Sequence, residues 1–381
     1  MLSLNAILMC AALLQALMLA HAFPGEENVR LIGRWNARGQ ANWPLSGFEV
    51  EISSPADTAA ASSLIVEFDQ CEGCQYVVET FADNVSQGRT TINATSLTLV
   101  VPLPASTQYV RVLKVTEADL GASDGGTVGV MSLASVKASG STFAAVDTAK
   151  STTHNSKMNA LKLLVFGDSL TCGYGALGVG PCDFTASTES AAASWARVTA
   201  TELHAELNQV TWSGKGVVRN YGDAQQTSEY PLPFYYNRTL GWNPTDKGFA
   251  EGDDLYWNPT TYQPDMILVL LGSNDYSTEP VPDTSVFIAG FSALVQQMQG
   301  DYPHSKIALL CSPDLSNTQK CANVKAAAAQ NNVHFLQIKP TDPVAWGGCN
   351  GHPNASQQQQ MAELSVIPFL KTILAETGPY T

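Results

Sequence analysis

The sequence is poor in charge, and above all in basic charge. Charged residues make up 14% of the 381 positions, with 20 Lys and Arg against 34 Asp and Glu, and the formal net charge is −14. The few basic residues form no cluster along the chain. Because nucleic acids and anionic membranes are bound by concentrated positive charge, we expect neither as a partner. An acidic, lightly charged chain instead suits a neutral substrate such as a polysaccharide.

Long apolar runs are also missing. None reaches the roughly 18 residues that a membrane-spanning helix needs. The most apolar stretch, residues 7–19, leads into Ala20-His21-Ala22, a small-x-small pattern typical of a signal-peptide cleavage site. We therefore expect residues 1–22 to be a signal peptide and the mature protein to be secreted; a buried N-terminal helix is the alternative. Four N-x-Ser/Thr sequons agree with an exported glycoprotein, at Asn84, Asn93, Asn237 and Asn354.

Signals for metal and nucleotide binding are lacking. The single C-x-x-C, Cys71 with Cys74, has no second C-x-x-C or histidine pair to complete a set of ligands. The glycines near Gly173 and Gly178 do not follow the dinucleotide-binding pattern with its downstream acid. We therefore expect no metal and no organic cofactor.

Cysteines are few but informative. The chain has eight, and seven remain once Cys10 leaves with the signal peptide, so at least one is unpaired or pairs between chains. In an oxidising compartment the nearest pairs are expected to form disulfides. The expected bonds are Cys71–Cys74, Cys172–Cys182 and Cys311–Cys321, with Cys349 left over.

The first part of the chain lacks helical periodicity. Short runs of alternating polar and apolar residues are separated by clusters of Gly, Pro, Asn and Ser, a pattern typical of antiparallel β-structure. These runs cover residues 48–52, 63–68, 75–79, 96–101 and 108–114. A β-sandwich (jelly roll) over residues 23–150 is the prediction, with a connection at 137–159 that is rich in Ser, Thr, Ala and Lys.

After residue 151 the pattern changes to short apolar strands that alternate with helices. Strands are expected at 161–166, 209–212, 266–271, 306–310 and 333–338. Helices are expected at 190–207, 284–299, 318–330 and 356–375. This alternation predicts an α/β domain over residues 151–381, with a parallel sheet covered by helices on both faces.

Candidate catalytic residues follow the ends of these strands. The carboxyl ends of parallel strands meet at one edge of a sheet, where sites form. Gly167 and then Ser169 follow the first strand. Gly214 and Gly216 follow the second strand, and Asn274 follows the third. His352 opens the last helix. Together they offer a nucleophile with its own N–H, further donors for an oxyanion, and a base.

These residues resemble the four blocks of the SGNH (GDSL-type) hydrolases. The matching stretches are GDSL at 167–170, SG at 213–214, GSND at 272–275, and His352. Further stretches are similar to carbohydrate esterase family 2. They are TCGYG at 171–175, CDFTASTES at 182–190, WSGKGVVRNYG at 212–222, GCNGHPN at 348–354, and GRWN at 33–36 with VTEA at 115–118.

The resemblance implies a three-layer αβα SGNH domain behind a jelly roll, and an esterase that removes acetyl groups from xylan or glucomannan. Ser169 would be the nucleophile and His352 the general base. The N–H of Ser169, Gly214 and the side chain of Asn274 would form the oxyanion hole, with Gly216 as the alternative to Gly214.

The aspartate that usually orients such a histidine is missing, since Cys349 and Asn350 stand three and two residues before His352. Replacing Asp by Asn at the orienting position of a serine protease lowers turnover about 10⁴-fold. A main-chain carbonyl can fix the tautomer instead, and some members of the resembled family are such Ser–His dyads. Asn350 and Gly351 are the expected orienting residues; Asp342 could fold back.

Aromatic residues are the candidates for contact with the substrate. Trp346, Tyr276 and Trp257 are candidates for stacking on sugars, although each could equally be a core or loop aromatic. Two other functions stay open. One is a broader GDSL lipase or arylesterase, and the other is a carbohydrate-binding protein without turnover.

Overall fold

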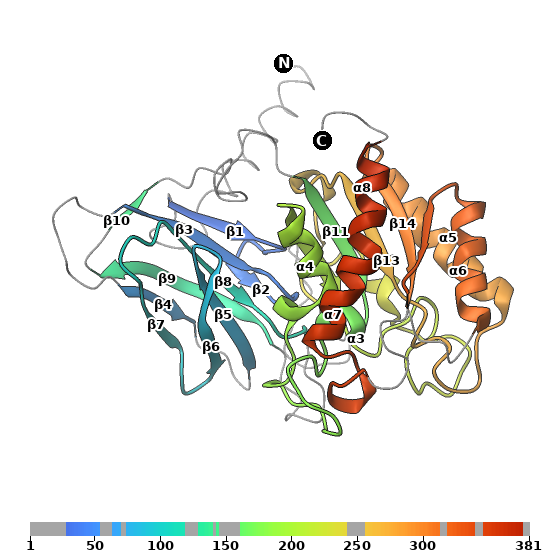
Figure 1. Ribbon diagram of the computed structural model, residues 1–381, viewed down its shortest axis with the longest axis horizontal. Helices are drawn as coiled ribbons and strands as arrows, with labels where there is room; N and C mark the ends of the chain where they lie inside the picture. The colour runs from blue at the N-terminus through green and yellow to red at the C-terminus, as the bar shows by residue number, and fades with distance from the viewer. Residues whose placement is uncertain are drawn as a thin grey trace, which may run out of the picture.

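The protein is described by a computed structural model in which two differently built halves lie side by side (Figure 1). The description covers residues 28–53, 63–69, 74–118, 129–139, 142–144, 161–241, 256–312, 318–339 and 346–375. The expected signal peptide, Cys71 and Asp342 lie outside these residues.

The first half is a sandwich of two antiparallel sheets. The larger has the order β1-β3-β8-β5-β6, with β10 also paired to β3, and the smaller has the order β2-β9-β4-β7. The strands are β1 (Val29–Ile32), β2 (Gln40–Ala41), β3 (Gly47–Ser53), β4 (Ser63–Phe68), β5 (Gln75–Ala82), β6 (Val85–Asn93), β7 (Thr98–Pro102), β8 (Tyr109–Lys114), β9 (Met131–Ser139) and β10 (Thr142–Ala144). In β4 every second side chain is buried, as the alternating pattern predicts. The predicted β-sandwich is confirmed.

The sandwich extends further along the chain than its composition predicts. The connection expected from residue 137 is instead the end of β9 and then β10. Lys137 pairs with Ile65 of β4, and Phe143 pairs with Ile52 of β3. Ladder hydrogen bonds to two established strands therefore override the weak strand propensity of a Ser-, Ala- and Lys-rich segment. The exact domain boundary stays a prediction, because residues 145–160 lie outside the description.

The second half is built on a five-stranded parallel sheet with the order β12-β11-β13-β14-β15. Its strands are β11 (Lys162–Gly167), β12 (Glu206–Thr211), β13 (Met266–Leu270), β14 (Lys306–Cys311) and β15 (His334–Gln337). Every residue of β13 is buried, as expected for a strand covered on both faces. The predicted α/β fold is confirmed.

Helices cover both faces of this sheet. One core packs α4 (Trp195–Glu202), α7 (Ala355–Met361) and α8 (Ile367–Ala375) on alternate strand residues, among them Leu163 and Val165. The other packs α5 (Thr284–Asp301) and α6 (Thr318–Gln330) on the residues between them, such as Leu164 and Phe166. Helix α5 turns Phe287, Phe291, Leu294, Val295 and Met298 inward at helical spacing.

Two helix boundaries differ from the prediction. The helix expected over residues 190–207 is a short 3₁₀ turn, Ala191–Ala193, followed by α4, and β12 already begins at Glu206. Pairing of β12 with β11 from Lys162 onward takes residues that propensity alone assigns to the helix. The last expected helix is interrupted by a π-helical turn at Ala362–Val366, between α7 and α8. Among the described residues, no helix has both the length and the apolar character to cross a membrane.

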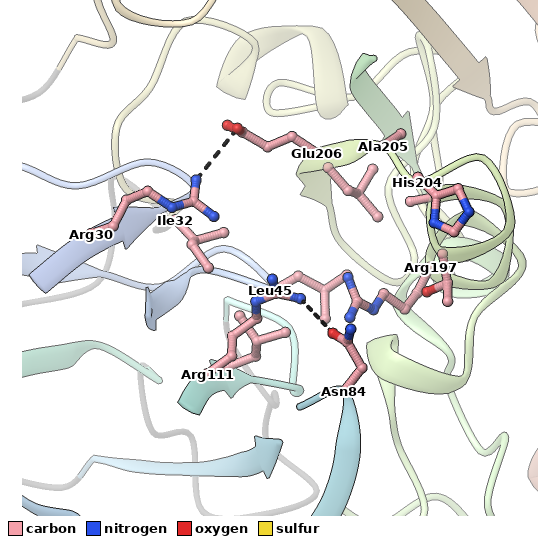
Figure 2. Close-up of a pocket in the computed structure, with 13 residues that line it drawn as sticks. Arg30, Ile32, Leu45, Asn84, Arg111, Arg197, His204, Ala205 and Glu206 are labelled. Carbon is pink, nitrogen blue, oxygen red and sulfur yellow. Dashed lines mark hydrogen bonds and ion pairs between the residues drawn. The ribbon is translucent and has the colours of Figure 1, made fainter. Parts of the chain in front are cut away.

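The sandwich packs on the α/β half through the outer face of its larger sheet. Ile32, Val77 and Leu113 share one core with Trp195 and Leu207. A cavity of about 150 Å³ remains in this interface, lined by both halves (Figure 2). Around it Arg30 pairs with Glu206 at 3.4 Å, and Arg111 of β8 lies near Arg197 of α4. None of the predicted catalytic residues lines this cavity.

Candidate active site

Ser169 and His352, 183 residues apart in the sequence, are in hydrogen-bond contact. The Nε2 atom of His352 lies 2.8 Å from the Oγ atom of Ser169. Both side chains are half-buried. This is the contact that a general base needs in order to take the proton of a serine nucleophile. The structure therefore brings together the two residues predicted to carry the chemistry.

The turn that carries Ser169 is held by its immediate neighbours. Ser169 opens the one-turn helix α3 (Ser169–Cys172), directly after β11. Asp168 is fully buried, and its carboxylate accepts the N–H of Leu170 at 3.1 Å. A side chain at Gly167 would collide with Thr171, and Gly173 ends the helix in the left-handed region at φ 72°. Asp168 therefore caps the N-terminus of α3.

The histidine is oriented by a main-chain oxygen. Its Nδ1 atom lies 3.1 Å from the carbonyl oxygen of Asn350. If Nδ1 carries the proton and donates it there, Nε2 is left free to accept the proton of Ser169. Asn350 has the left-handed φ of 48°, which asparagine tolerates better than most residues. Of the two expected orienting residues, Asn350 makes the contact, through its backbone.

One aromatic residue that the sequence analysis leaves without a role supports this histidine. The ring of Tyr174 lies 4.4 Å from the ring of His352 and stacks on Phe184 at 4.0 Å. Its hydroxyl accepts a hydrogen bond from the side-chain amide of Asn350 at 3.3 Å. Tyr174 belongs to the TCGYG stretch and lies five residues after Ser169, but nothing in the sequence joins that stretch to the histidine.

A disulfide fastens the histidine loop, and it corrects two predictions. Cys349 is bonded to Cys182, so it is not left over and Cys182 does not pair with Cys172. Cys172 is a buried free thiol. The predicted Cys311–Cys321 bond is confirmed, and Cys74 is disulfide-bonded. Nearest-neighbour pairing fails because the fold brings two loops together that lie 167 residues apart.

Backbone contacts reinforce the same junction. Asn350 N–H donates to the carbonyl of Cys182 at 2.8 Å, and Cys349 N–H donates to that of Gly175 at 3.2 Å. Gly175 has a φ of 63°, and an added Cβ there would lie 2.9 Å from Cys349. Only glycine allows the two loops to come this close.

The two further residues predicted to donate to an oxyanion lie on adjoining elements. Gly214 follows β12 with a φ of 75°. Asn274 follows β13, is 7% exposed, and donates one amide hydrogen to the carbonyl of Lys215 at 2.8 Å. Its amide nitrogen is 3.4 Å from the carboxylate of Asp168, a long contact that holds the second hydrogen only weakly.

Gly216 is placed differently from Gly214. Its N–H donates to the side-chain oxygen of Asn220 at 3.3 Å, and an added Cβ would meet Arg219 and Asp275. Asp275 is buried and accepts the N–H groups of Val217, Val218 and Arg219 at 2.8–2.9 Å. Gly216 therefore belongs to the turn that Asp275 caps, and Gly214 is the better candidate donor.

Burial changes the proton affinity of the predicted base. It lowers the pKa of His352 below its ordinary value, while the main-chain contacts with Asn350 and Cys349 act in the opposite direction. A neutral imidazole is the form that can accept a proton, so this shift widens the pH range in which His352 is ready to act.

The predicted sugar-stacking aromatics are unequally placed. Trp346 is half-buried beside the histidine loop, and its carbonyl accepts the N–H of Asn354 at 2.7 Å. Tyr276 is 8% exposed, packs on Phe287, and accepts a hydrogen bond from Asn323, so little of its ring is open to a ligand. Trp257 is half-buried, 5.1 Å beneath the guanidinium of Arg34.

One group in the described chain has ligand atoms close enough to hold a metal, namely Glu117, Cys172 and Glu189, all buried. Hydrogen bonds already engage one oxygen of each carboxyl group. The Lys114 ammonium acts electrostatically on both. With that charge already balanced in part by protein groups, we assign no metal here.

Comparison with known proteins agrees with this geometry. A model of the GDSL-like lipase/acylhydrolase family matches residues 165–360. The acetylxylan esterase / glucomannan deacetylase of Cellvibrio japonicus is 30% identical over 216 residues, which is 56% of this chain and 57% of that protein. The cellulase/esterase CelE of Acetivibrio thermocellus is 28% identical over 215 residues, 53% of this chain and 24% of that protein. The chain thus spans about half or less of the length of these relatives.

Solved structures share the whole two-part architecture. A family two carbohydrate esterase from Clostridium thermocellum, in complex with cellohexaose, superimposes with a TM-score of 0.73 at 23% identity, covering 91% of this chain and 99% of that one. An acetyl xylan esterase from Butyrivibrio proteoclasticus gives 0.73 at 16% identity, covering 92% and 97%. At these identities the likeness establishes the fold. With a family model that spans just over half of its length, the chain belongs to the GDSL-like lipase/acylhydrolase family.

Proposed function

We propose that the protein is a secreted serine esterase that removes O-acetyl groups from polysaccharides of the xylan or glucomannan type, using a Ser–His dyad. The observation that carries the proposal is the relay from Ser169 Oγ through His352 to the carbonyl oxygen of Asn350. It supplies a nucleophile, a base and a fixed tautomer without a carboxylate.

The relatives support the choice of substrate. One 30% identical to this chain is named for the deacetylation of xylan and glucomannan, and a structure with the same fold holds a cello-oligosaccharide. The net charge of −14 suits a neutral glycan. The apolar stretch and small-x-small pattern of residues 7–22 support secretion.

The first half-reaction acylates the enzyme. His352 Nε2 takes the proton of Ser169 while Oγ attacks the acetyl carbonyl, and the oxyanion that forms faces the N–H groups of Ser169 and Gly214 and the amide of Asn274. Collapse of the tetrahedral intermediate breaks the bond to the sugar oxygen. The imidazolium returns its proton to that oxygen, which leaves as the free hydroxyl.

The second half-reaction runs through the same steps in reverse, with water in place of the sugar hydroxyl. His352 takes a proton from water, the hydroxide attacks the acetyl carbon, and Ser169 leaves with the proton from the imidazolium. Acetate is released. The Asn350 carbonyl holds the ring throughout but contributes less stabilisation to the imidazolium than a carboxylate would. No step requires a metal or an organic cofactor.

Trp346 is the best placed of the three candidate aromatics to contact the sugar. It begins the loop that ends at His352, and its half-buried side chain packs against the core that includes Leu170 and Phe184. Asn354, two residues after the base, caps α7 by accepting the N–H of Gln357 at 3.0 Å.

Acetate release from acetylated xylan and acetylated glucomannan, measured beside the Ser169→Ala variant, tests the proposal. We expect release by the parent and none above background by the variant. Two other outcomes would replace it. Binding of the polysaccharide without release would indicate a carbohydrate-binding protein, and preference for long acyl esters over acetyl would indicate a lipase or arylesterase.

A further inference from the structure

A carboxylate from the β-sandwich reaches the loop that holds the oxyanion donors. Glu117 lies three residues beyond the end of β8 and is 3% exposed. Its Oε2 atom accepts the N–H of Ser213, in the α/β half, at 2.5 Å. Its own N–H donates to Oε1 of Glu189 at 3.3 Å. The Glu117 segment is thus fixed at the interface through both its backbone and its side chain.

The partner of this carboxylate is the residue immediately before Gly214. Trp212 N–H still bonds to the β11 carbonyl of Gly167 at 3.1 Å, and Ser213 is the first residue past that pairing. Fixing the N–H of Ser213 constrains the peptide plane before it and, through one pair of dihedrals, the direction of the Gly214 N–H. That N–H is a proposed oxyanion donor.

Besides this contact, the loop is held through the carbonyl of Gly214, which accepts the N–H of Tyr221 at 2.8 Å. Gly214 is in the left-handed region, and a Cβ added there would have just one neighbour within 4 Å, the Cβ of Tyr221 at 4.0 Å. Because no side chain packs there, the peptide that carries the Gly214 N–H depends for its direction on the residues before it. Downstream, the loop is anchored by Asp275 from Val217 onward. Glu117 is the matching anchor upstream.

The same loop also positions the second donor. The carbonyl of Lys215, the residue after Gly214, accepts one amide hydrogen of Asn274 at 2.8 Å and so sets the direction of the other. A shift of residues 213–215 would therefore move two of the three donors together.

We propose that Glu117 is a positioning residue for the oxyanion hole, through which the β-sandwich holds the 213–215 loop in its working conformation. This rests on the proposed acyl-transfer role of Ser169, and it gives the sandwich a part in the reaction beyond packing or glycan binding.

The charge around Glu117 fits this role. Burial raises the pKa of Glu117 to about 7, while the hydrogen bond from Ser213 and the Lys114 ammonium favour the ionised form. Burial and the neighbouring Glu117 raise the pKa of Glu189, which favours its neutral form. Cys172 is buried beside them, and burial likewise keeps its thiol protonated by raising its pKa. Glu117 is the member of this cluster that contacts the loop, and a charged acceptor holds an N–H about twice as strongly as a neutral one.

Hydrolysis of p-nitrophenyl acetate by Glu117→Ala and Glu117→Gln provides the test. Loss of the carboxylate loosens two donors, each worth roughly 10²–10³ in kcat when deleted outright, so we expect Glu117→Ala to lower kcat by about 10–100-fold with KM changed less than about threefold. Gln keeps an acceptor oxygen, and Glu117→Gln should recover at least about half of the logarithmic loss.

Glu49→Gln is the matched control. Glu49 is a buried carboxylate of β3, and its partners are Arg111 at 2.9 Å and Arg30 at 3.5 Å, both in the β-sandwich. It should lower the midpoint of thermal unfolding without the selective loss of kcat. If Glu117→Ala does not fold, the kcat of Glu117→Gln is compared with that of Glu49→Gln. Equal kcat values for these two variants, both folded, would overturn the proposal.

A double-mutant cycle with Asn274→Ala separates positioning from general destabilisation. If Glu117 acts through both donors, Glu117→Ala should lower kcat clearly less in the Asn274→Ala background than in the parent, because only the Gly214 N–H is then left to be displaced. Full additivity of the two losses would contradict the proposal.

The readout does not depend on the natural substrate. A parent that cleaves p-nitrophenyl acetate but no acetylated polysaccharide would refute the proposed substrate and leave the role of Glu117 testable. Labelling of Ser169 by a fluorophosphonate, whose phosphoryl oxygen occupies the oxyanion position, is measured in parallel. Equal labelling rates in parent and Glu117→Ala would overturn the inference even without ester turnover.

Discussion

The turn that carries Ser169 and the loop that carries His352 differ in how far away their supports lie. Ser169 is held by Asp168, Gly167 and Gly173, all within four residues. His352 depends on partners from residues 174–182, joined to its loop by a disulfide that spans 167 positions. A local turn can form from its own sequence, whereas the second arrangement exists only once the fold has assembled.

The comparison also shows what replaces the missing aspartate. A carboxylate would orient the imidazole through one strong bond. Here the main-chain oxygen of Asn350 does so, and its place is secured by the Cys182–Cys349 bond and by the ring of Tyr174. A neutral acceptor is a weaker partner for an imidazolium, so the geometry of the loop has to be held more firmly.

The largest expected loss of kcat follows from removing Ser169 or His352, the residues at which the two regions meet. Ser169→Ala and His352→Ala should each lower kcat for acetyl esters by a factor on the order of 10⁴ or more, and the double variant should be no worse than either, because the two act as one unit. Steady-state kinetics with active-site titration checks this. A His352→Ala variant within about tenfold of the parent would show that the histidine is not the base.

Removing the Cys182–Cys349 bond should separate the two regions. Replacing both cysteines by serine opens a far longer loop than the same change at Cys311–Cys321, whose residues are 10 apart. Loop-closure entropy alone predicts about 5 against about 3 kcal/mol of lost stability. In protein still folded, we expect kcat to fall about tenfold or more in the first case and less than about twofold in the second.

Equal kcat losses in the two disulfide variants would contradict the claim that the Cys182–Cys349 bond serves the histidine loop in particular. Urea unfolding, followed by kinetics below the transition, separates the stability effect from the effect on turnover.

Tyr174 offers a smaller test of the histidine side. Tyr174→Ala removes the ring that lies 4.4 Å from His352 and should lower kcat by about tenfold through a less ordered base. Tyr174→Phe keeps the ring and loses only the contact with the Asn350 amide, so it should stay within about threefold of the parent. Equal losses in both variants would assign the effect to the hydroxyl.

The pH dependence of kcat/KM tests the effect of having a neutral acceptor, the Asn350 carbonyl, beside His352. Because His352 must be unprotonated to act and burial lowers its pKa, the acidic limb of kcat/KM should lie below the ordinary histidine value of about 6.5. Asn350→Asp places a carboxylate nearby, which stabilises the imidazolium and should move that limb to higher pH. A limb that stays in place would show that the side chain of residue 350 does not act on the ring.

The same contrast explains what the sequence could predict. The GDSL turn, the glycine after β12 and Asn274 are signalled by residues next to a buried strand, and the parallel sheet brings these strand ends together. The Cys182–Cys349 pair, Tyr174 and Glu117 carry no such local signal, because their partners are distant in sequence. Cys172 looks like the nearer partner of Cys182, yet it is the last residue of α3 and its thiol is buried.

In the fold, the strongly periodic elements are predicted well and the ends of elements less so. Strands β11, β13 and β14 are apolar throughout and stand out in the sequence. The end of β9 and all of β10 are missed because Ser, Ala and Lys are weak strand formers, and pairing with β3 and β4 decides their conformation.

Turnover by Asn350→Gly tests the central claim most directly. Glycine keeps the left-handed backbone and the carbonyl that faces His352 while removing the side chain. If the main-chain oxygen orients the base, kcat for acetate release should stay within about threefold of the parent. A loss on the order of 10² or more in a folded protein would show that the asparagine side chain does the work, and would contradict the account.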